Sequence, residues 1–287
     1  MIARASLDKG GRIGLIAGSG RLPHLFAQAA SSRGLSVIAV AHRGETDPSL
    51  SAQVDALWWV RLGQIDRIVR IFREGKVNVA VMAGGVSRLR ALTGFQPDLG
   101  ALRVLLRLRT FGDDALLRAI ASYLEEAGIQ ILAPTDFLSE IFAPSGHLAG
   151  PELDPGQRRD VEVGMRVAEL LGKADVGQTV VVKKGQVLAL EAIEGTDETV
   201  RRGARLGGAG AIVIKLSKPG QDQRFDLPTV GANTVAVMRE CGANVLAVEA
   251  GKTILLDAAA LFGQADRDHI TLLGVVLSAS SLGHRQR

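Results

Sequence analysis

Short apolar runs alternate with helical segments through the first half of the chain, and this alternation constrains the fold more than any other feature. Arg12–Ala17 and Leu35–Ala41 have the composition of buried strands, and Pro23–Ser32 between them is predicted to be a helix. Further strands are predicted at Ala56–Val60, Val77–Met82 and Ile129–Ala133, and further helices at Gln64–Glu74 and Asp113–Ala127. Strands that alternate with helices favour a parallel sheet covered by helices on both faces.

A stretch rich in proline and glycine divides the chain. Residues 144–157 hold three prolines and three glycines, which disfavour both a helix and a central strand. With 287 residues, the chain has the length of two ordinary domains. We therefore predict an N-terminal Rossmann-like parallel-sheet domain at residues 1–143, a linker at 144–157 and a second α/β domain at 158–287.

The second half is predicted to mix strands and helices in a different order. Thr179–Val182 and Val187–Glu191 have the pattern of a hairpin around Lys184 and Gly185. Further strands are predicted at 211–214, 244–249, 253–256 and 270–276, and helices at 158–171, 199–207, 233–240 and 257–264.

Charge and cysteine content limit the class of protein. The formal net charge is only +4, which is compatible with an anionic ligand or membrane surface but too small to favour nucleic acid. The single cysteine, Cys241, excludes a disulfide within the chain. We find no apolar run of transmembrane length and no cleavable signal peptide. We expect a cytoplasmic protein with at most a peripheral contact to the inner membrane, and a homodimer is possible.

Two glycine-rich loops follow predicted strands of the first domain. Gly18-Ser19-Gly20 follows the first strand, and Gly84-Gly85, with Ser87 close behind, follows the fourth. Loops after parallel strands share one edge of the sheet, so the pair suggests a cleft that binds a phosphate or a sugar. Tight strand-to-helix turns explain the glycines equally well.

A dinucleotide site is disfavoured at the first loop. Pro23 stands where the third glycine of the Gly-x-Gly-x-x-Gly pattern belongs. His42 and Arg43 follow the second strand, where an acidic residue would hold a ribose.

A polar loop at Lys215–Gly231 carries the strongest chemical signal. It follows an apolar strand and precedes a predicted helix, and it is too rich in charge, proline and glycine to be either. Lysine and arginine can hold a phosphate while a carboxylate holds a metal or a water molecule, so the composition suits phosphate chemistry. A solvated basic loop is the alternative. The candidate residues are Lys215, Lys218, Gln221, Arg224, Asp226 and Thr229.

Acidic residues at two predicted helix starts are further candidates. Asp113 and Asp114 open one helix, where Asp113 as a helix cap is an explanation without function. Glu194, Thr196 and Asp197 precede another. If that edge faces the polar loop, Glu194 and Asp226 can share one Mg²⁺, an ion that needs few carboxylates when phosphate is present. The histidine pattern of two-metal phosphoesterases, a serine nucleophile elbow and a P-loop are all absent from the sequence.

The polar loop resembles the signature of the LpxI-type UDP-2,3-diacylglucosamine hydrolases. The shared pattern is Lys-x-x-Lys-Pro-x-Gln-Asp-x-Arg-x-Asp-Leu-Pro-Thr-Val-Gly, which begins at Lys215 and ends at Gly231. Segments at 13–23, 112–118 and 194–202 also look like parts of this family. The resemblance runs in consistent order from about Arg12 to about Val276.

The resemblance implies an activity and assigns roles. It implies Mg²⁺-dependent hydrolysis of UDP-2,3-diacylglucosamine to UMP and 2,3-diacylglucosamine 1-phosphate (lipid X) in lipid A biosynthesis, with water attacking the sugar-side phosphorus. It also implies two domains with the substrate at their interface, the second domain being catalytic. Asp226 matches the family's essential aspartate, and we assign it to metal or water activation. Lys215, Lys218 and Arg224 would neutralise the diphosphate.

Two other classes of function remain to be compared. A non-catalytic protein that binds a nucleotide sugar or phospholipid would explain the glycines and cations but leave Asp226 without a role. An oxidoreductase is disfavoured by Pro23 and the missing ribose acid. The predicted substrate-binding residues are Gly18, Ser19, Gly20, Gly84, Gly85, Ser87, Asp113, Asp114, Thr196, Asp197, Gln221 and Thr229.

Overall fold

The fold is given by a computed structural model of the chain. It describes residues 10–86, 95–108, 113–138, 141–219, 222, 224–225 and 227–277, with only the backbone of Asp113 and Asp114. The chain forms two compact units. Unit 1 comprises Met1–Ser139 together with Asp222–Asp226, and unit 2 comprises Glu140–Gln221 together with Leu227–Arg287. A short piece of the polar loop is therefore part of unit 1 although its flanks belong to unit 2.

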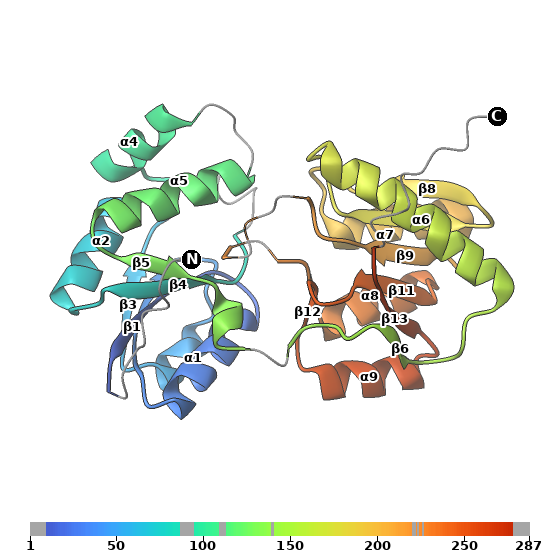
Figure 1. The fold of residues 1–287 in the computed structure, drawn as a ribbon, viewed down its shortest axis with the longest axis horizontal. Helices are drawn as coiled ribbons and strands as arrows, with labels where there is room; N and C mark the ends of the chain where they lie inside the picture. The colour runs from blue at the N-terminus through green and yellow to red at the C-terminus, as the bar shows by residue number, and fades with distance from the viewer. Residues whose placement is uncertain are drawn as a thin grey trace. The chain divides into compact units, whose positions relative to one another are not determined.

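Unit 1 is built on a five-stranded sheet in which every pairing is parallel (Figure 1). The spatial order is β3-β2-β1-β4-β5. The strands are β1 (Arg12–Ala17), β2 (Ser36–His42), β3 (Ala56–Val60), β4 (Val79–Ala83) and β5 (Gln130–Leu132). The predicted parallel sheet is confirmed, because each apolar run that alternates with a helix in the sequence is one of its strands.

Helices cover both faces of this sheet (Figure 1). On one face lies α1 (Leu22–Ser32), where Phe26 meets Phe137 edge to face at 5.1 Å between ring centroids. On the other face, α2 (Ile65–Glu74) and α5 (Asp113–Glu126) bury Phe72 and Leu124 in one core with the strands. Short 3₁₀ turns occupy Pro48–Gln53 and Pro134–Asp136.

A further helix, α4 (Leu99–Arg107), was not predicted from the sequence. Asp98 caps it by accepting a hydrogen bond from the N–H of Ala101 at 3.0 Å, and the same carboxylate accepts one from the N–H of Asp66 at 2.8 Å. Ala101 and Val104 are buried with Ile65 in a small cluster between α4 and its neighbours. The helix is short, and Gly100 in its first turn weakens the sequence signal.

Unit 2 contains a mixed six-stranded sheet in the order β6-β13-β11-β9-β7-β8. The three central strands β9, β11 and β13 are parallel, whereas β6, β7 and β8 pair antiparallel. The strands are β6 (Gly146–Ala149), β7 (Thr179–Lys183), β8 (Gln186–Leu190), β9 (Ile212–Lys215), β11 (Val245–Glu249) and β13 (Thr271–Val275). A second α/β unit is thus confirmed, and the predicted hairpin is β7 with β8.

Helices also lie on both faces of the second sheet. The long helix α6 (Pro155–Lys173) packs Val161, Ala168 and Leu171 against one face. The other face is covered by α7 (Thr196–Gly207), α8 (Ala232–Cys241) and α9 (Ala258–Arg267). Asp154 and Gln157 form a reciprocal capping box at the start of α6, which explains why this helix begins earlier than its apolar pattern suggests.

One expectation for the second half needs correction. Residues 146–149 of the expected linker form β6, which pairs with β13, so these residues belong to the sheet. The strand predicted at 253–256 is confirmed as β12 (Ile254–Leu255), and its partner is β10 (Thr229–Val230), which was not predicted, in a separate two-stranded sheet. Such short pairings leave little periodicity for a sequence to show.

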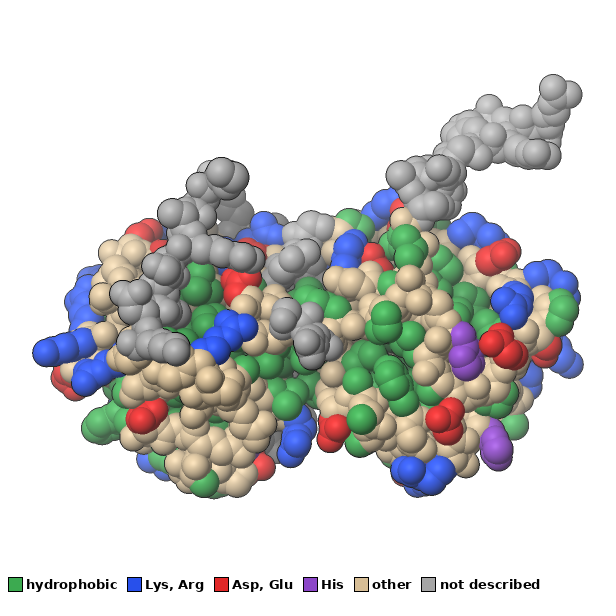
Figure 2. Space-filling view, turned by 60° about the horizontal axis from the view of Figure 1, so that its bottom comes forward, with side chains coloured by type: hydrophobic (Ala, Val, Ile, Leu, Met, Phe, Trp, Pro, Cys, Tyr) green, Lys and Arg blue, Asp and Glu red, His purple; other side chains and the backbone are tan. Residues whose placement is uncertain are grey.

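The described surface carries charges of both signs. Figure 2 shows basic and acidic side chains interspersed over the face that it draws. Along the part of the chain that the structure describes, no helix combines the length and the apolar character that crossing a bilayer requires.

Candidate functional site

The two glycine loops of unit 1 pair with each other, as expected for loops that follow neighbouring parallel strands. Ser19 forms an isolated bridge with Gly85. The N–H of Ser19 donates to the carbonyl of Gly85 at 2.7 Å, and the N–H of Gly85 donates back to Ser19 at 3.1 Å. The hydroxyl of Ser19 donates to the same Gly85 carbonyl at 3.0 Å. The prediction that the two loops share one sheet edge is confirmed.

This pairing changes what the loops can offer a ligand. The N–H groups of Gly18, Ser19 and Gly85 all donate to carbonyls of the protein, that of Gly18 to Ala83 at 2.8 Å. They are therefore not arranged as a row of free donors for a phosphate. The close backbone approach also explains the glycines, because a Cβ on Gly18 would lie 2.3 Å from the carbonyl oxygen of Gly85.

An apolar cavity of about 370 Å³ opens beside the glycine loops within unit 1. Its wall combines backbone of the loops with side chains of α2, α4 and α5, and Phe225 from the polar loop closes part of it. The lining includes Gly18, Gly84, Gly85, His42, Ile65, Ile68, Met82, Phe95, Val104, Leu105, Leu116, Leu117, Ile120 and Phe225. No sequence pattern predicted this cavity, because its aliphatic residues have the same pattern as ordinary core.

Among the described residues of that lining, His42 has the titratable side chain. It is buried, and its Nδ1 lies 3.1 Å from the carbonyl oxygen of Ala17. Burial lowers the pKa of the His42 imidazole, which outweighs the opposing effects of the Ala17 carbonyl and Glu45. The ring is therefore neutral at pH 7, and the cavity keeps its apolar character.

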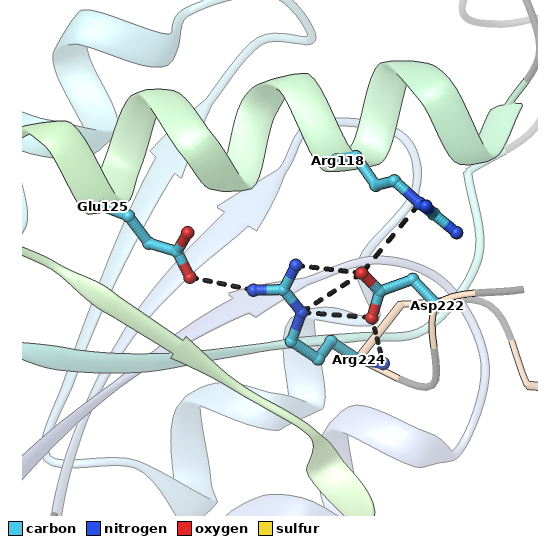
Figure 3. Close-up of polar contacts among 4 residues, drawn as sticks. All are labelled: Arg118, Glu125, Asp222 and Arg224. Atoms are coloured by element: carbon cyan, nitrogen blue, oxygen red, sulfur yellow. Dashed lines mark hydrogen bonds and ion pairs between the residues drawn. The ribbon is translucent and has the colours of Figure 1, made fainter. Parts of the chain in front are cut away.

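Asp222 and Arg224 of the polar loop lie beside helix α5 within unit 1 (Figure 3). Arg224 Nη1 lies 2.8 Å from Glu125 Oε1, and Arg224 Nη2 lies 2.9 Å from Asp222 Oδ2. Arg118, which is also on α5, has its Nε 4.0 Å from the same Asp222 oxygen. The Arg224 guanidinium also lies over the Phe225 ring, 4.8 Å from its centroid.

The ion pairs shift both partners toward their charged forms. Partial burial alone would raise the pKa of the Asp222 carboxyl, but hydrogen bonds from Arg224 outweigh burial and lower that pKa. The Asp222 carboxylate in turn raises the pKa of the Arg224 guanidinium, against the opposing effect of burial. Sequence reasoning assigned Arg224 to the substrate diphosphate. Its two carboxylate partners come from the loop itself and from 99 residues away, so no local pattern indicated them.

In unit 2, Lys215 and Thr229 lie together at the carboxyl end of β9. Lys215 is buried, and its Nζ donates to the Thr229 carbonyl at 3.0 Å, which links the two ends of the polar loop. Next to them, the buried carboxylate of Glu249 accepts a hydrogen bond from the N–H of Ser217 at 2.9 Å and one from its hydroxyl. Lys252 Nζ lies 2.6 Å from the other Glu249 oxygen. The sequence analysis did not select Glu249 as a candidate, although an acidic residue at the end of a buried strand could have indicated it.

Three further predicted residues of unit 2, Lys218, Asp197 and Thr196, have described partners. Lys218 pairs with Asp175 at 3.0 Å. Asp197, in the first turn of α7, accepts a hydrogen bond from Asn233 of α8 at 2.9 Å, so the amino ends of these two helices are neighbours. Thr196 contacts Thr179 and Glu191 at 3.2 and 3.3 Å between side-chain oxygens.

Glu194 is held by groups of its own loop and helix. Its carboxylate accepts hydrogen bonds from Arg202, from the N–H of Ala192 at 3.1 Å and from Thr199 at 3.4 Å. Its own backbone N–H and then Arg202 lower the pKa of the Glu194 carboxyl. These contacts describe a structural ion pair at the start of α7. Whether Glu194 also ligates a metal stays a prediction.

Several predicted residues lie outside what the structure describes. They are Asp226, Ser87 and Gln221, and the side chains of Asp113 and Asp114. Gly20 lies in the turn after β1 with a φ of +87°, a backbone conformation that favours glycine. Within the described residues, no group of three or more acidic, histidine or cysteine side chains could hold a metal ion.

The fold and these clusters define a two-unit α/β protein with an apolar cavity in one unit and a polar loop shared by both. The chain belongs to the LpxI family. The model of the LpxI N-terminal domain matches residues 12–141, and that of the LpxI C-terminal domain matches residues 144–273. A protein of Caulobacter vibrioides, UDP-2,3-diacylglucosamine pyrophosphatase LpxI, is 34% identical over 275 residues, which cover 92% of this chain and 97% of that protein.

Solved structures of other proteins show only distant likeness. A multifunctional pyruvate carboxylase from Rhizobium etli is 13% identical with a TM-score of 0.24; the match covers 39% of this chain and spans 13% of the length of that chain. The protein gox2253 is 10% identical with a TM-score of 0.30, over 86% of this chain and 78% of that one. Scores this low carry no argument about fold or function.

The close approach of the glycine loops predicts unequal effects of two substitutions. Gly18→Ala should lower the free energy of unfolding by about 2 kcal/mol or more, because the new methyl group meets backbone that must move. Gly85→Ala is the matched control: its Cβ would lie 3.4 Å from the nearest atom, Ser19 Oγ, so its effect should stay within about 0.5 kcal/mol. Urea unfolding followed by circular dichroism measures both. Equal stability of the two variants would contradict the geometry.

Proposed function

We propose that this chain hydrolyses UDP-2,3-diacylglucosamine to UMP and 2,3-diacylglucosamine 1-phosphate, a step of lipid A biosynthesis. It is an enzyme of the UDP-2,3-diacylglucosamine pyrophosphatase LpxI family. The observation that carries the proposal is the likeness to the Caulobacter vibrioides enzyme, which extends over nearly the whole of both chains. A cytoplasmic location, a peripheral contact with the inner membrane and a homodimer belong to the same proposal.

The apolar cavity of unit 1 supports a substrate with a fatty acyl chain. Its volume, about 370 Å³, lies within the range of small-molecule sites, about 300–1,000 Å³. Aliphatic side chains from three helices line it, and its histidine is neutral because burial lowers the pKa of His42. Such a lining stabilises hydrocarbon through removal of apolar surface from water, by about 0.8 kcal/mol for each buried methylene.

The polar loop supplies the groups for the diphosphate chemistry. We assign Lys215 and Lys218 to the neutralisation of charge that grows on the departing UMP. Asp226, which matches the family's essential aspartate, accepts a proton from the attacking water or helps to hold a cation. The described partners of Arg224 are two carboxylates, which favour a positioning role for this third cation.

A magnesium ion would depend on few groups of this chain. Glu194 already accepts hydrogen bonds on both carboxylate oxygens, which makes it a poorer ligand than sequence alone suggested. We therefore propose a site in which Asp226 is the protein carboxylate and substrate phosphate oxygens and water complete the shell, as Mg²⁺ prefers. The ion would neutralise phosphate charge.

Removal of the Asp226 carboxylate should abolish turnover. Purified protein incubated with UDP-2,3-diacylglucosamine and Mg²⁺ should release UMP, which chromatography detects. Asp226→Ala should keep the unfolding midpoint of the parent, because a carboxylate in a polar loop contributes little to a core. Activity above about a tenth of the parent would mean a loss of less than about 1.4 kcal/mol and would exclude Asp226 as the central group. No UMP from the parent protein would favour a non-catalytic binding protein.

A divalent cation should be required for turnover. Activity should disappear in excess EDTA and return when Mg²⁺ is added above the chelator concentration, because a diphosphate substrate with few protein carboxylates needs an added charge. The UMP assay measures this with and without chelator. Glu194→Gln should retain its response to Mg²⁺ if its contacts with Arg202 and Ala192 are its main role. Full turnover in EDTA would mean that lysines alone balance the charge.

The attacking water should bond to the sugar-side phosphorus. In this route the new oxygen–phosphorus bond forms on the lipid phosphate, the bond to the bridging oxygen breaks, and UMP leaves with the electron pair. Hydrolysis in ¹⁸O-water should therefore place the label in 2,3-diacylglucosamine 1-phosphate, as mass spectrometry of both products measures. The label in UMP would reverse the assignment and place the attack at the uridine-side phosphorus.

A further inference from the structure

Asp222, Arg224 and Phe225 form a compact segment inside the polar loop. Arg224 engages both oxygens of Asp222, with Nε 3.0 Å from Oδ1 and Nη2 2.9 Å from Oδ2. The backbone N–H of Arg224 donates to Asp222 Oδ1 at 3.1 Å, and the N–H of Phe225 donates to the Asp222 carbonyl at 3.1 Å. A bidentate arginine–carboxylate contact fixes the relative orientation of the two side chains as well as their distance. The segment is therefore folded upon itself.

The same segment is fastened to helix α5 by charge and by apolar contact. Glu125 accepts from the free side of the Arg224 guanidinium at 2.8 Å, and Arg118 approaches Asp222 on the helix surface (Figure 3). Phe225 is half-buried and packs against the core of unit 1. Asp222 and Arg224 are 18% and 32% exposed, so water screens the cluster less than it screens an open surface pair.

We propose that this cluster is a dock that fixes the reactive loop on α5, and that Glu125 and Arg224 are positioning residues for the hydrolysis. Arg224 is followed in the chain by Phe225 and then by Asp226, so a fixed Arg224 and Phe225 restrict where the next carboxylate can lie. Small errors in the placement of a reactive group cost large factors in rate. The effect of Glu125 and Arg224 on the rate rests on the proposed function, whereas the contact of the loop with α5 does not.

Hydrogen exchange tests the dock without any substrate. Glu125→Gln removes the charge that holds Arg224 and keeps the shape of the side chain. Exchange at the N–H groups of Arg224 and Phe225, measured by mass spectrometry, should become about fivefold faster. Glu126→Gln is the matched control, because Glu126 pairs with Arg107 on the same helix at 2.7 Å and should leave this exchange unchanged. Equal exchange rates in the parent and in Glu125→Gln would contradict the proposal that Glu125 holds the loop on α5.

Kinetics separate positioning from contact with phosphate. In the parent background, Glu125→Gln should lower kcat about fivefold with KM unchanged, and in an Arg224→Gln background it should have no further effect. Two results together would overturn the positioning role. They are a strong rise of KM in Arg224→Gln and an unchanged kcat in Glu125→Gln. Arg224 would then contact the diphosphate directly. If the parent protein releases no UMP, the proposed function is refuted. The exchange measurement would still show whether the loop is held on α5.

Discussion

The parallel pairing of β1 with β4 is the constraint on which the first unit depends. Ala17 lies opposite Ala83 in the register, so both strands end at the same level and their loops must pass side by side. The backbones there are too close for side chains, which is why glycine stands at 18 and 84. The paired loops are then held by the Ser19–Gly85 bridge and become one wall of the apolar cavity. A strand pairing thus determines the shape of a binding surface.

The charged side chains of the polar loop have two roles: they support the loop itself, and they are proposed to take part in the phosphate chemistry. Lys215 lies buried at the base of the loop and holds the Thr229 carbonyl, while Arg224 further along is held by carboxylates. Both contacts stabilise the path of the loop. The composition that suits phosphate chemistry therefore also supplies the loop with its own internal supports, and counting cations alone overestimates what is available to a ligand.

Much of the fold was predictable because its signals are local. Strands such as β1 and β3 carry uninterrupted apolar runs, and the neighbouring glycine loops follow from parallel pairing alone. The helix α4 and strand β6 were missed because each is short and contains glycine. The candidate site was less predictable. Arg224 meets Glu125 across 99 positions of sequence, and only the folded chain brings such residues together.

Unit 1 is not a continuous stretch of chain, because Asp222–Asp226 completes it after most of unit 2 has been encoded. On a ribosome the five strands of the first sheet emerge before Phe225. At usual rates of synthesis, roughly 5–20 residues per second, the first sheet would wait several seconds for that ring to close its cavity. Until then the part of the cavity that Phe225 closes would be open to water or to a chaperone. The last packing step of the N-terminal unit thus coincides with synthesis of the loop that is proposed to carry the chemistry.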